Sequence, residues 1–588
     1  MEPPGPNPAN REYEGEAPRP FRQGDRGPLL ERLVPLIPVL RGYRREWLGR
    51  DLLAGVVIAA LAVPQAMAYA QTAGMPVQAG LYALLVPVVA YAALGSSRRL
   101  MTGPTAAAAL LVPAAVLPIA APGTATYLAA ASMLALLVGA ALVLARVLRL
   151  GWITDYISVA VLLGFLTGMA LTLVTGQLMA FFGVSVAGGT PVQQVIDFTD
   201  KADSVHWLTA AFALVVLLLL FAGDRWLPKF PMLLAVTVLA IVLSWALDLQ
   251  SHGFRVVGSI PSGLPLPSWP SVGFVQVLEL APTAVGIALV VFADAILTAR
   301  SVGRGHVDAD QELLALGGLN VGAGLFGSFP VGGSGSRTAV NVRLGGRTQL
   351  AAVWQAVTAA VVLLVLTPAL AYLPRATLAA VIIYAAIGLI DVPSWRALAH
   401  GSRAELLIAA VTVAGMLTVG LLPALVFAVL LSVLDAVRRS AQSRDAVLGW
   451  SPRHDRFVDV QRHPEARVVP GVVVYRLDDR LFFANSRYFR TRVLEAVDGA
   501  PYPVHDVVFD AEGVTHLDGS GAAALRDLVE ELRTRQVGFA TARMKAAVSA
   551  QCDQLGLRDV VPAVVRFPTV HAAVLAISGV DVTATGPA

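Results

Sequence analysis

The sequence predicts a polytopic α-helical membrane protein with a smaller α/β domain at its C-terminal end, and three observations support this fold class. Of 588 residues, 56% are hydrophobic and only 14% are charged, whereas about a quarter are charged in soluble proteins. Apolar runs near the ~20 residues that cross a bilayer recur along most of the chain. From Val469 onward, short apolar strands alternate with helical segments, a pattern typical of α/β domains.

Composition excludes several classes of function. Cys552 is the single cysteine, which excludes disulfides, CxxC motifs and thiolate metal sites. The formal net charge is only +4, and the arginines gather at the ends of apolar runs, so no nucleic-acid partner is expected. The nine histidines are scattered without an HExxH pair, and no catalytic triad or phosphate loop stands out. The sequence therefore predicts neither an enzyme nor an organic cofactor.

Fourteen apolar segments are expected, two of them too short to cross a bilayer alone. Arg41, Arg44, Arg45 and Arg50 precede the first segment, which places the N-terminus in the cytoplasm by the positive-inside rule. An even number of segments returns the chain to that side after Arg439, as expected of a multi-pass plasma-membrane protein with both termini cytoplasmic. The predicted segments are 51–72, 76–95, 104–120, 126–146, 152–183, 206–222, 231–248, 281–301, 311–328, 335–346, 349–367, 376–391, 404–420 and 421–438.

Changes in local composition predict that the chain is divided into five regions. Residues 1–28 are rich in proline, glycine and charge, and are expected to be disordered. The membrane-spanning domain is expected over 29–439, and a polar, charged linker is expected over 440–468. The α/β domain covers 469–577, and 578–588 form a C-terminal tail.

An internal repeat relates the two halves of the apolar region. The run from Gln65 to Gly74 resembles the run from Asp294 to Gly303, at an offset of 229 residues. The same offset carries Gly103-Pro104-Thr105 onto Gly332-Gly333-Ser334, where the two short segments begin. Seven segments separate the equivalent runs, and an odd number inverts the second half relative to the first.

Two half-helices that begin near the bilayer midplane from opposite sides would make an anion site. Their first N–H groups are unpaired and carry the positive ends of the helix dipoles. Arg337, one turn into the second half-helix, adds a positive charge. The expected anion contacts are Gln65, Tyr69, Pro104, Thr105, Ala106, Gly335, Ser336 and Arg337. For Gln65 and Tyr69 the alternative is hydrogen bonding between helices.

Asp294 lies inside an apolar segment, where an unpaired carboxylate is costly, and Thr298 lies one turn further on the same face. Three interpretations remain open. Asp294 and Thr298 could bind Na⁺ together with backbone at Gly333, Ser334 and Gly335; Asp294 could carry a coupling proton; or it could neutralise Arg337 in a structural salt bridge. No other metal site is expected.

Several motifs together resemble the SulP family of anion transporters, and the resemblance extends from about Leu30 over nearly the whole chain. These motifs are Val63–Ala70, Gly80–Tyr82, Thr102–Ala106, Asp310–Gly317, Ser336–Asn341 and Gly346–Gln349. The resemblance implies seven-plus-seven inverted repeats, a core domain that moves against a gate domain, and an anion between the third and tenth segments. It also implies a homodimer and a C-terminal STAS domain, in which Leu517–Gly521 is the turn from a strand to a helix.

Two positions depart from the family pattern. Many members carry Glu where Asp294 stands, while Asp followed by Thr298 resembles the sodium site of the family's cyanobacterial bicarbonate transporters. Related anti-anti-sigma proteins carry a phosphorylatable serine where this chain has Gly519, although Ser520 follows directly.

The sequence thus predicts a secondary transporter of small anions that works by alternating access, with sulfate as the first expectation. Alternatives are Na⁺-coupled bicarbonate transport and H⁺-coupled dicarboxylate transport. Other functional classes are an anion channel, and an anion sensor that signals through the STAS domain to a cytosolic partner.

Overall fold

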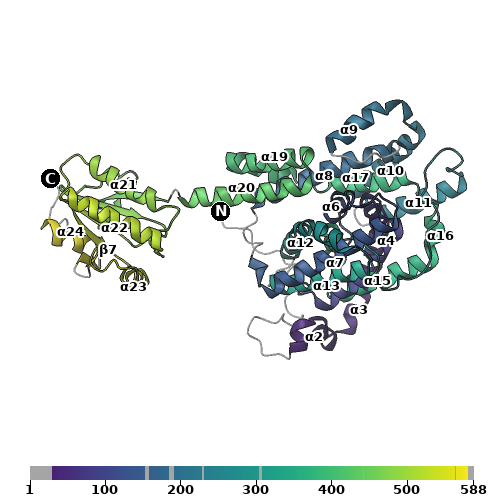
Figure 1. Ribbon diagram of the computed structural model, residues 1–588, viewed down its shortest axis with the longest axis horizontal. Coiled ribbons are helices and arrows are strands. Elements are labelled where there is room, and N and C mark those ends of the chain that lie inside the picture. Colours follow the sequence, from purple (N-terminus) through teal and green to yellow (C-terminus); the bar gives the residue numbers. More distant parts are fainter. Residues whose placement is uncertain are drawn as a thin grey trace. The chain divides into compact units, whose positions relative to one another are not determined.

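Every predicted apolar segment contains a helix in the computed structural model, which describes residues 29–152, 158–184, 191–227, 231–302, 307–441, 443–562 and 565–579 (Figure 1). The predicted tail 1–28 lies outside the described residues, as does all of the C-terminal tail beyond Gly579. The chain divides into two compact units near Leu430.

The first unit is helical, and eight helical stretches among its described residues are long and apolar enough to cross a membrane. Its helices are α1 (Leu29–Leu33), α2 (Leu36–Arg41), α3 (Arg45–Thr72), α4 (Val77–Tyr82), α5 (Val86–Leu94), α6 (Ala106–Val116), α7 (Ala125–Val147), α8 (Val159–Phe181), α9 (Pro191–Asp200), η3 (Ala202–Ser204), α10 (Trp207–Trp226), α11 (Met232–Ala246), α12 (Phe274–Val302), α13 (Ala309–Leu325), α14 (Gly335–Arg343), α15 (Leu350–Val361), η4 (Val362–Leu366), α16 (Thr367–Leu370), α17 (Arg375–Ile387), α18 (Val392–Gly401), α19 (Arg403–Thr418) and α20 (Leu421–Ala441), which continues into the second unit.

Local sequence explains where several helices begin and change. Thr124 and Ser158 cap α7 and α8, because their hydroxyls accept hydrogen bonds from backbone N–H groups of the first turn. Asp308 does the same for α13. The π-helical turn η4 lies directly before Pro368, whose missing N–H and bulky ring disturb the regular α-helical ladder.

The helices of the two halves pack reciprocally. The first residues of α3 and α12 are 229 residues apart, and so are those of α6 and α14. Helix α3 packs on α14 and α15, while α12 packs on their equivalents α6 and α7. Helices α7 and α13 approach closely, since a Cβ on Gly139 would lie 2.9 Å from the Gly317 carbonyl oxygen. These contacts are consistent with a pseudo-two-fold relation between the halves.

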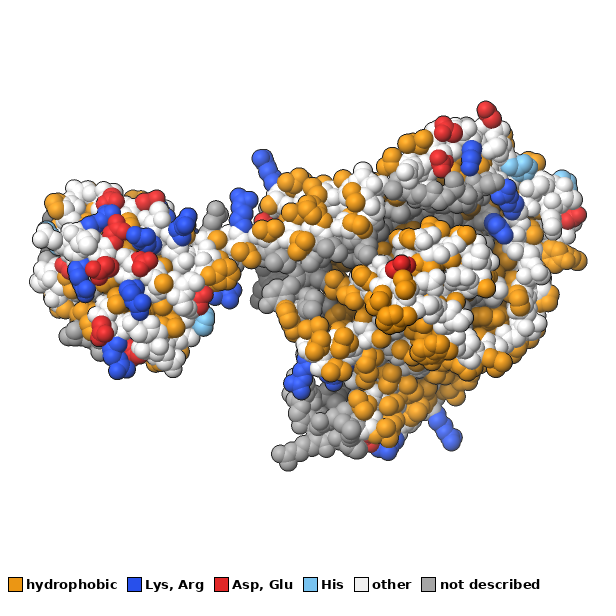
Figure 2. All heavy atoms as spheres, viewed as in Figure 1, with side chains coloured by type: hydrophobic (Ala, Val, Ile, Leu, Met, Phe, Trp, Pro, Cys, Tyr) orange, Lys and Arg blue, Asp and Glu red, His pale blue; other side chains and the backbone are white. Residues whose placement is uncertain are grey.

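The surface differs between the two units. Figure 2 shows hydrophobic side chains over much of the visible face of the helical unit, while charged side chains of both signs cover the visible face of the smaller domain. Exposed apolar side chains such as Leu218, Val242 and Leu364 lie on helices α10, α11 and η4. In a chain of this hydropathy, such side chains are the ones that meet lipid.

The second unit contains a six-stranded sheet in the order β4-β3-β5-β6-β7-β8. Strands β5 to β8 are parallel, whereas β3 is antiparallel to both its neighbours. The strands are β3 (Asp445–Ser451), β4 (Arg456–Asp459), β5 (Val472–Leu477), β6 (Asp506–Asp510), β7 (Gly538–Ala542) and β8 (Arg566–Phe567), and the helices are α21 (Ser486–Asp498), α22 (Gly519–Thr534), α23 (Ala546–Gln554) and α24 (Val570–Ser578).

Alternate residues of β5 pack against helices on opposite faces of the sheet. Val473 and Tyr475 belong to the core that includes α21, α22 and α23, whereas Val474 belongs to the core formed with α24. The turn expected around Asp518 is present, because its side chain caps α22 and accepts a hydrogen bond from Gly521 N at 2.7 Å. The apolar run 481–483 also predicts a strand, and this prediction is wrong, because Leu481 forms only an isolated bridge with Leu517.

The linker predicted over 440–468 is wrong in its central part. Strand β3 pairs with β5, and Leu448 lies opposite Val474. Asp445 at the start of β3 accepts hydrogen bonds from Tyr475 OH at 2.9 Å and Arg492 Nε at 3.0 Å. Polar residues at the ends of β3 hide its strand character in the sequence, and its side chains Leu448 and Trp450 are buried in the core formed with α24.

Candidate functional site

Two short strands meet at the centre of the helical unit. Strands β1 (Thr102–Gly103) and β2 (Gly332–Gly333) are antiparallel, and Gly103 lies opposite Gly332. Gly103 has a φ of 140°, a backbone conformation that residues other than glycine rarely adopt. Strand pairing satisfies backbone groups that would otherwise be exposed at membrane depth. The predicted interruptions of the third and tenth segments are therefore present and lie against each other.

A half-helix begins directly after each strand. Thr105 caps α6, with its hydroxyl 3.4 Å from Ala108 N. At α14, by contrast, no described side chain caps the first turn, and Gly335 and Ser336 are exposed. The two half-helices thus differ in capping within the described residues, while both starts carry the positive end of a helix dipole.

Arg337 joins the two half-helices. Its side chain is only 2% exposed, and Nη2 donates a 2.7 Å hydrogen bond to the carbonyl oxygen of Pro104, just before α6. The guanidinium also lies against Gly103, where a Cβ would be 2.7 Å from Nη1. Within the described residues, Arg337 Nε has no hydrogen-bond partner. A buried guanidinium with an unused donor is a site that an anion would complete.

Polar side chains of α14 fasten it to the segment before β1. Thr338 Oγ1 accepts a 2.9 Å hydrogen bond from Met101 N, and Asn341 Nδ2 donates one of 2.9 Å to the Arg99 carbonyl oxygen. Ser334 N donates to the Met101 carbonyl oxygen at 2.8 Å. These contacts hold Arg337 in place relative to the start of α6.

Asp294 and Thr298 lie on α12, which runs directly beside β2. A Cβ on Gly333 would lie 2.9 Å from Ala295 Cα, and one on Gly335 would lie 3.8 Å from Thr298 Oγ1. The structure thus brings α12 against the backbone predicted to share a cation. Among the described residues, no ion pair joins Asp294 to Arg337, whose hydrogen bond goes to Pro104 instead. The direct salt bridge is therefore not formed.

Helix α3 carries Gln65 and Tyr69, of which Tyr69 lies near the same region. Tyr69 is 8% exposed and lies within electrostatic range of both Arg337 and Asp294. Gln65 is half-buried one turn earlier on α3. Helix α3 packs on α6 and α14, which bring Ala106 and Arg337 to it. All of the predicted anion-contact residues therefore belong to α3 or to the starts of the two half-helices.

Glu312 supports the site, although its local sequence does not distinguish it from an ordinary helix residue. Its fully buried carboxylate accepts hydrogen bonds from Tyr91 OH at 2.7 Å, from Ser96 N at 2.9 Å and Oγ at 2.7 Å, and from Ser97 N at 2.8 Å. These bonds hold the segment that leads into β1. In the sequence, Glu312 is a carboxylate near the start of an otherwise apolar helix. This pattern is equally typical of an exposed residue in the first turn of a helix, so it does not predict burial.

Asp51 plays a similar part after α14. It is fully buried on α3 and accepts hydrogen bonds from Thr348 Oγ1 at 2.6 Å, Arg347 N at 2.7 Å and Tyr43 OH at 3.1 Å. Glu312 thus binds donors from the chain before α6, and Asp51 binds donors from the chain after α14.

Comparison with known proteins identifies both parts of the chain. The sulfate permease family model matches residues 48–412, and the STAS domain model matches residues 463–573. "Probable sulfate transporter" of Mycobacterium tuberculosis strain H37Rv is 41% identical over 515 residues, which cover 87% of this chain and 92% of the relative. "Sulfate transporter 4.1, chloroplastic" of Arabidopsis thaliana is 32% identical over 569 residues, which cover 93% of this chain and 82% of the relative.

Solved structures share the fold. The murine Slc26a9 anion transporter in its inward-facing state matches with a TM-score of 0.86 at 23% identity, over 97% of this chain and 98% of that chain. The transmembrane domain of the cyanobacterium bicarbonate transporter BicA matches with a TM-score of 0.56 at 26% identity, over 67% of this chain and 98% of that chain.

Proposed function

The chain belongs to the sulfate permease family and carries a C-terminal STAS domain, and from this premise we propose that it transports sulfate across a membrane by alternating access. The family consists of transporters, so the protein is an anion transporter and not an enzyme. The relatives described above are named sulfate transporters, which favours sulfate as the substrate.

One observation carries the proposal: Arg337 is buried between the two half-helices with its Nε unused by the described residues. An anion held there would accept hydrogen bonds from this guanidinium and from the uncapped first turn of α14. The exposure of Gly335 and Ser336 supports an approach from the aqueous side. Sulfate offers four acceptor oxygens and two charges to these donors.

The reciprocal packing of the two halves supports a seven-plus-seven inverted repeat with the anion near its axis. A core that contains α3, α6, α12 and α14 would move past a gate formed by the remaining membrane helices. We extend the proposal to a homodimer in the plasma membrane with both termini cytoplasmic, a topology supported by the arginine-rich ends of the segments.

Coupling to sodium is the second part of the proposal. Asp294 and Thr298 lie on the helix that contacts β2, and Gly335 lies beside the Thr298 hydroxyl. Carboxylate, hydroxyl and carbonyl oxygens are hard ligands that suit Na⁺. Proton coupling through Asp294 is the competing mechanism, and bicarbonate is the competing substrate because the BicA transmembrane domain shares the fold.

The test is uptake of radiolabelled sulfate by the purified full-length chain in proteoliposomes. We expect saturable uptake that unlabelled sulfate competes away more strongly than bicarbonate or a dicarboxylate, and that increases under an inward Na⁺ gradient. If a pH gradient alone drives uptake, the coupling ion is the proton and not sodium. Conductance without saturable exchange would indicate a channel instead, and anion binding without flux would indicate a sensor.

A further inference from the structure

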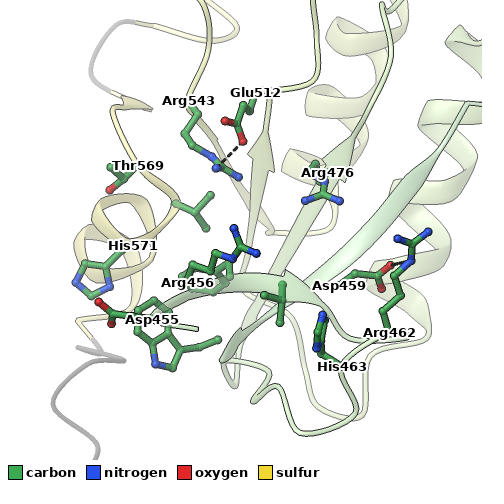
Figure 3. Close-up of a pocket in the computed structure, with 14 residues that line it drawn as sticks. Asp455, Arg456, Asp459, Arg462, His463, Arg476, Glu512, Arg543, Thr569 and His571 are labelled. Carbon is green, nitrogen blue, oxygen red and sulfur yellow. Dashed lines mark ion pairs between the residues drawn. The ribbon is translucent and has the colours of Figure 1, made fainter. Parts of the chain in front are cut away.

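The STAS domain contains a cavity of about 730 Å³ beside strand β4, with charged side chains around its rim (Figure 3). Asp459, Arg462 and His463 lie together on one side of it, away from Arg543 and Glu512. The turn between β3 and β4 contributes Asp455. The transport mechanism proposed above uses none of these residues.

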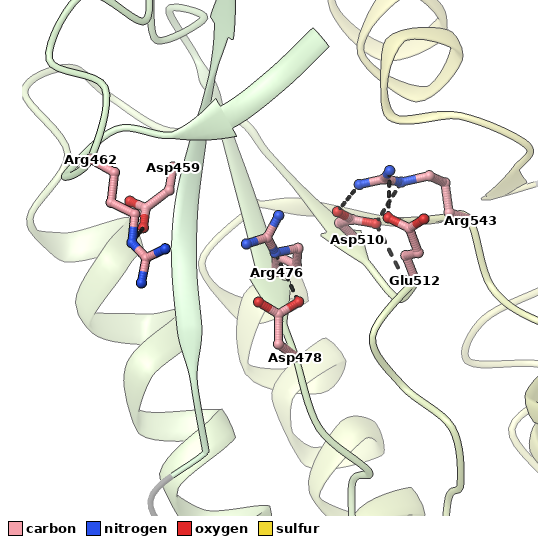
Figure 4. A network of polar contacts seen from close by, with 7 residues as sticks. All are labelled: Asp459, Arg462, Arg476, Asp478, Asp510, Glu512 and Arg543. Carbon is pink, nitrogen blue, oxygen red and sulfur yellow. Dashed lines mark hydrogen bonds and ion pairs between the residues drawn. The ribbon is translucent and has the colours of Figure 1, made fainter. Parts of the chain in front are cut away.

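Three arginines of this region form ion pairs with carboxylates of the same domain (Figure 4). Arg543 pairs with Asp510 and Glu512, and Arg476 Nε lies 2.9 Å from Asp478 Oδ1. Arg462 Nε lies 3.7 Å from Asp459 Oδ2. These pairs neutralise part of the positive charge around the cavity, which lessens the repulsion that a bound cation would meet.

His454, His463 and Glu465 form a compact group next to the cavity, here called the histidine cluster. One potential ligand atom from each residue lies within 4.8 Å of the others. His463 Nδ1 is 3.1 Å from Glu465 Oε1, and the two imidazole rings are 5.2 Å apart with an interplanar angle of 70°.

Backbone hydrogen bonds position the histidine cluster. His454 N donates to the Ser451 carbonyl oxygen at 3.2 Å within the turn from β3 to β4. His463 N donates to the Asp459 carbonyl oxygen at 2.9 Å, directly after β4. The backbone groups of Trp450 and Arg467 form two hydrogen bonds, of 2.7 and 2.8 Å, which hold the loop after β4 against β3. The two histidines thus meet because the hairpin and its following loop fold onto the same strand.

We propose that His454, His463 and Glu465 bind a divalent transition-metal ion, best matched by Zn²⁺. Two imidazoles and one carboxylate are a recurrent ligand set for zinc, with a fourth position left to water. Ligands about 2.0–2.1 Å from a tetrahedral zinc lie about 3.3 Å from each other. The distance of 3.1 Å between His463 Nδ1 and Glu465 Oε1 is already close to this ligand separation. Because the three ligand atoms all lie within 4.8 Å of one another, small side-chain rotations would bring them to the zinc-binding geometry. Calcium and magnesium prefer oxygen ligands throughout.

The bound ion would brace one wall of the cavity. It would join the β3–β4 turn to the loop after β4, and His463 itself lines the cavity. The ion would therefore stiffen the free edge of the sheet, where β4 has a neighbour on one side only. This inference does not depend on the transported anion or on its coupling ion.

The test uses the full-length protein purified in detergent with a tag that contains no histidine, treated with chelator and then dialysed against Zn²⁺. We expect one zinc per chain by elemental analysis. Replacement of zinc by Co²⁺ should give the visible absorption of a tetrahedral site. His463→Ala and His454→Ala should each weaken zinc binding by about 10- to 100-fold or more, since loss of even an outer partner of a ligand has that effect. Glu465→Gln keeps the side-chain shape and should weaken binding as well.

His505→Ala is the matched control, because His505 is an exposed histidine of the same domain outside the cluster. It should retain the wild-type stoichiometry and affinity. Circular dichroism of the metal-free variants should match that of the wild type, so that lost binding reports lost ligands rather than unfolding. The proposal is overturned if the wild type retains less than stoichiometric zinc, or if a variant that combines His454→Ala, His463→Ala and Glu465→Gln binds zinc as tightly as the wild type.

Discussion

Gly103 and Gly332 lie opposite each other in the antiparallel pair β1–β2, and their separation of 229 residues is the same as that between the first residues of α3 and α12. Each glycine is thus paired with its own counterpart in the repeat. A two-fold axis that passes between them would produce this pairing. The half-helices that follow are consequently brought end to end, with Arg337 crossing from one to the other.

Replacing Arg337 by alanine should abolish sulfate uptake. The substitution removes the only charged side chain on the first turn of α14 and its hydrogen bond to Pro104. Uptake into proteoliposomes should fall by at least about 100-fold, the equivalent of the roughly 3 kcal/mol that loss of a charge-assisted hydrogen bond costs. Arg343→Ala, on an exposed position of the same helix, should keep near-normal uptake. Uptake by folded Arg337→Ala at the level of this control would remove Arg337 from the mechanism.

Asp294→Asn should uncouple transport from its driving ion. The amide nearly preserves the shape of the side chain but removes the charge that would bind Na⁺ or accept a proton. We expect uptake to become insensitive to imposed Na⁺ and pH gradients, measured separately. The control is Glu279→Gln, an exposed carboxylate on the same helix. If uptake by Asp294→Asn still follows either gradient, the coupling role of Asp294 is refuted.

Gly103→Ala should impair both stability and transport. Alanine at φ 140° is strained by about 1–3 kcal/mol, and its Cβ would lie 2.7 Å from Arg337 Nη1 and 3.1 Å from Leu84 Cδ2. The apparent melting temperature in detergent should fall and uptake should drop sharply. Gly49→Ala is the comparison, because a Cβ at that helical position meets no atom within 4 Å. Equal behaviour of the two variants would argue against a tightly packed β1–β2 pair.

Glu312→Gln should destabilise the protein although it is nearly isosteric. Glutamine keeps one oxygen, so its amide nitrogen would face either the Tyr91 hydroxyl or the N–H groups of Ser96 and Ser97, and the charge that these donors now stabilise would be lost. We expect a loss of about 2–5 kcal/mol, the range for breaking a buried charged network. Thermal unfolding followed by fluorescence measures this effect. Glu46→Gln, an exposed carboxylate on α3, should leave the transition unchanged. An unchanged transition in Glu312→Gln as well would show that the segment before β1 is held by other contacts.

The sequence by itself determined the features that depend on local composition. Membrane helices follow from the length of apolar runs, and the breaks before α6 and α14 occur at Gly103-Pro104 and at Gly332-Gly333, residue types that weaken a helix. The repeat was visible for the same reason, since a fixed offset relates similar local patterns. The capped start of α22 at Asp518 was also recognisable from the chain alone.

The tertiary structure alone decided which distant groups meet. Arg337 and Pro104 are 233 residues apart, and Asp51 reaches the backbone N–H of Arg347, 296 residues away. The pairing of β3 with β5, and the meeting of His454 with His463, likewise depend on how the chain folds back rather than on its composition. A buried polar side chain must find a partner, but packing of whole elements chooses that partner, and no local pattern in the chain encodes the choice.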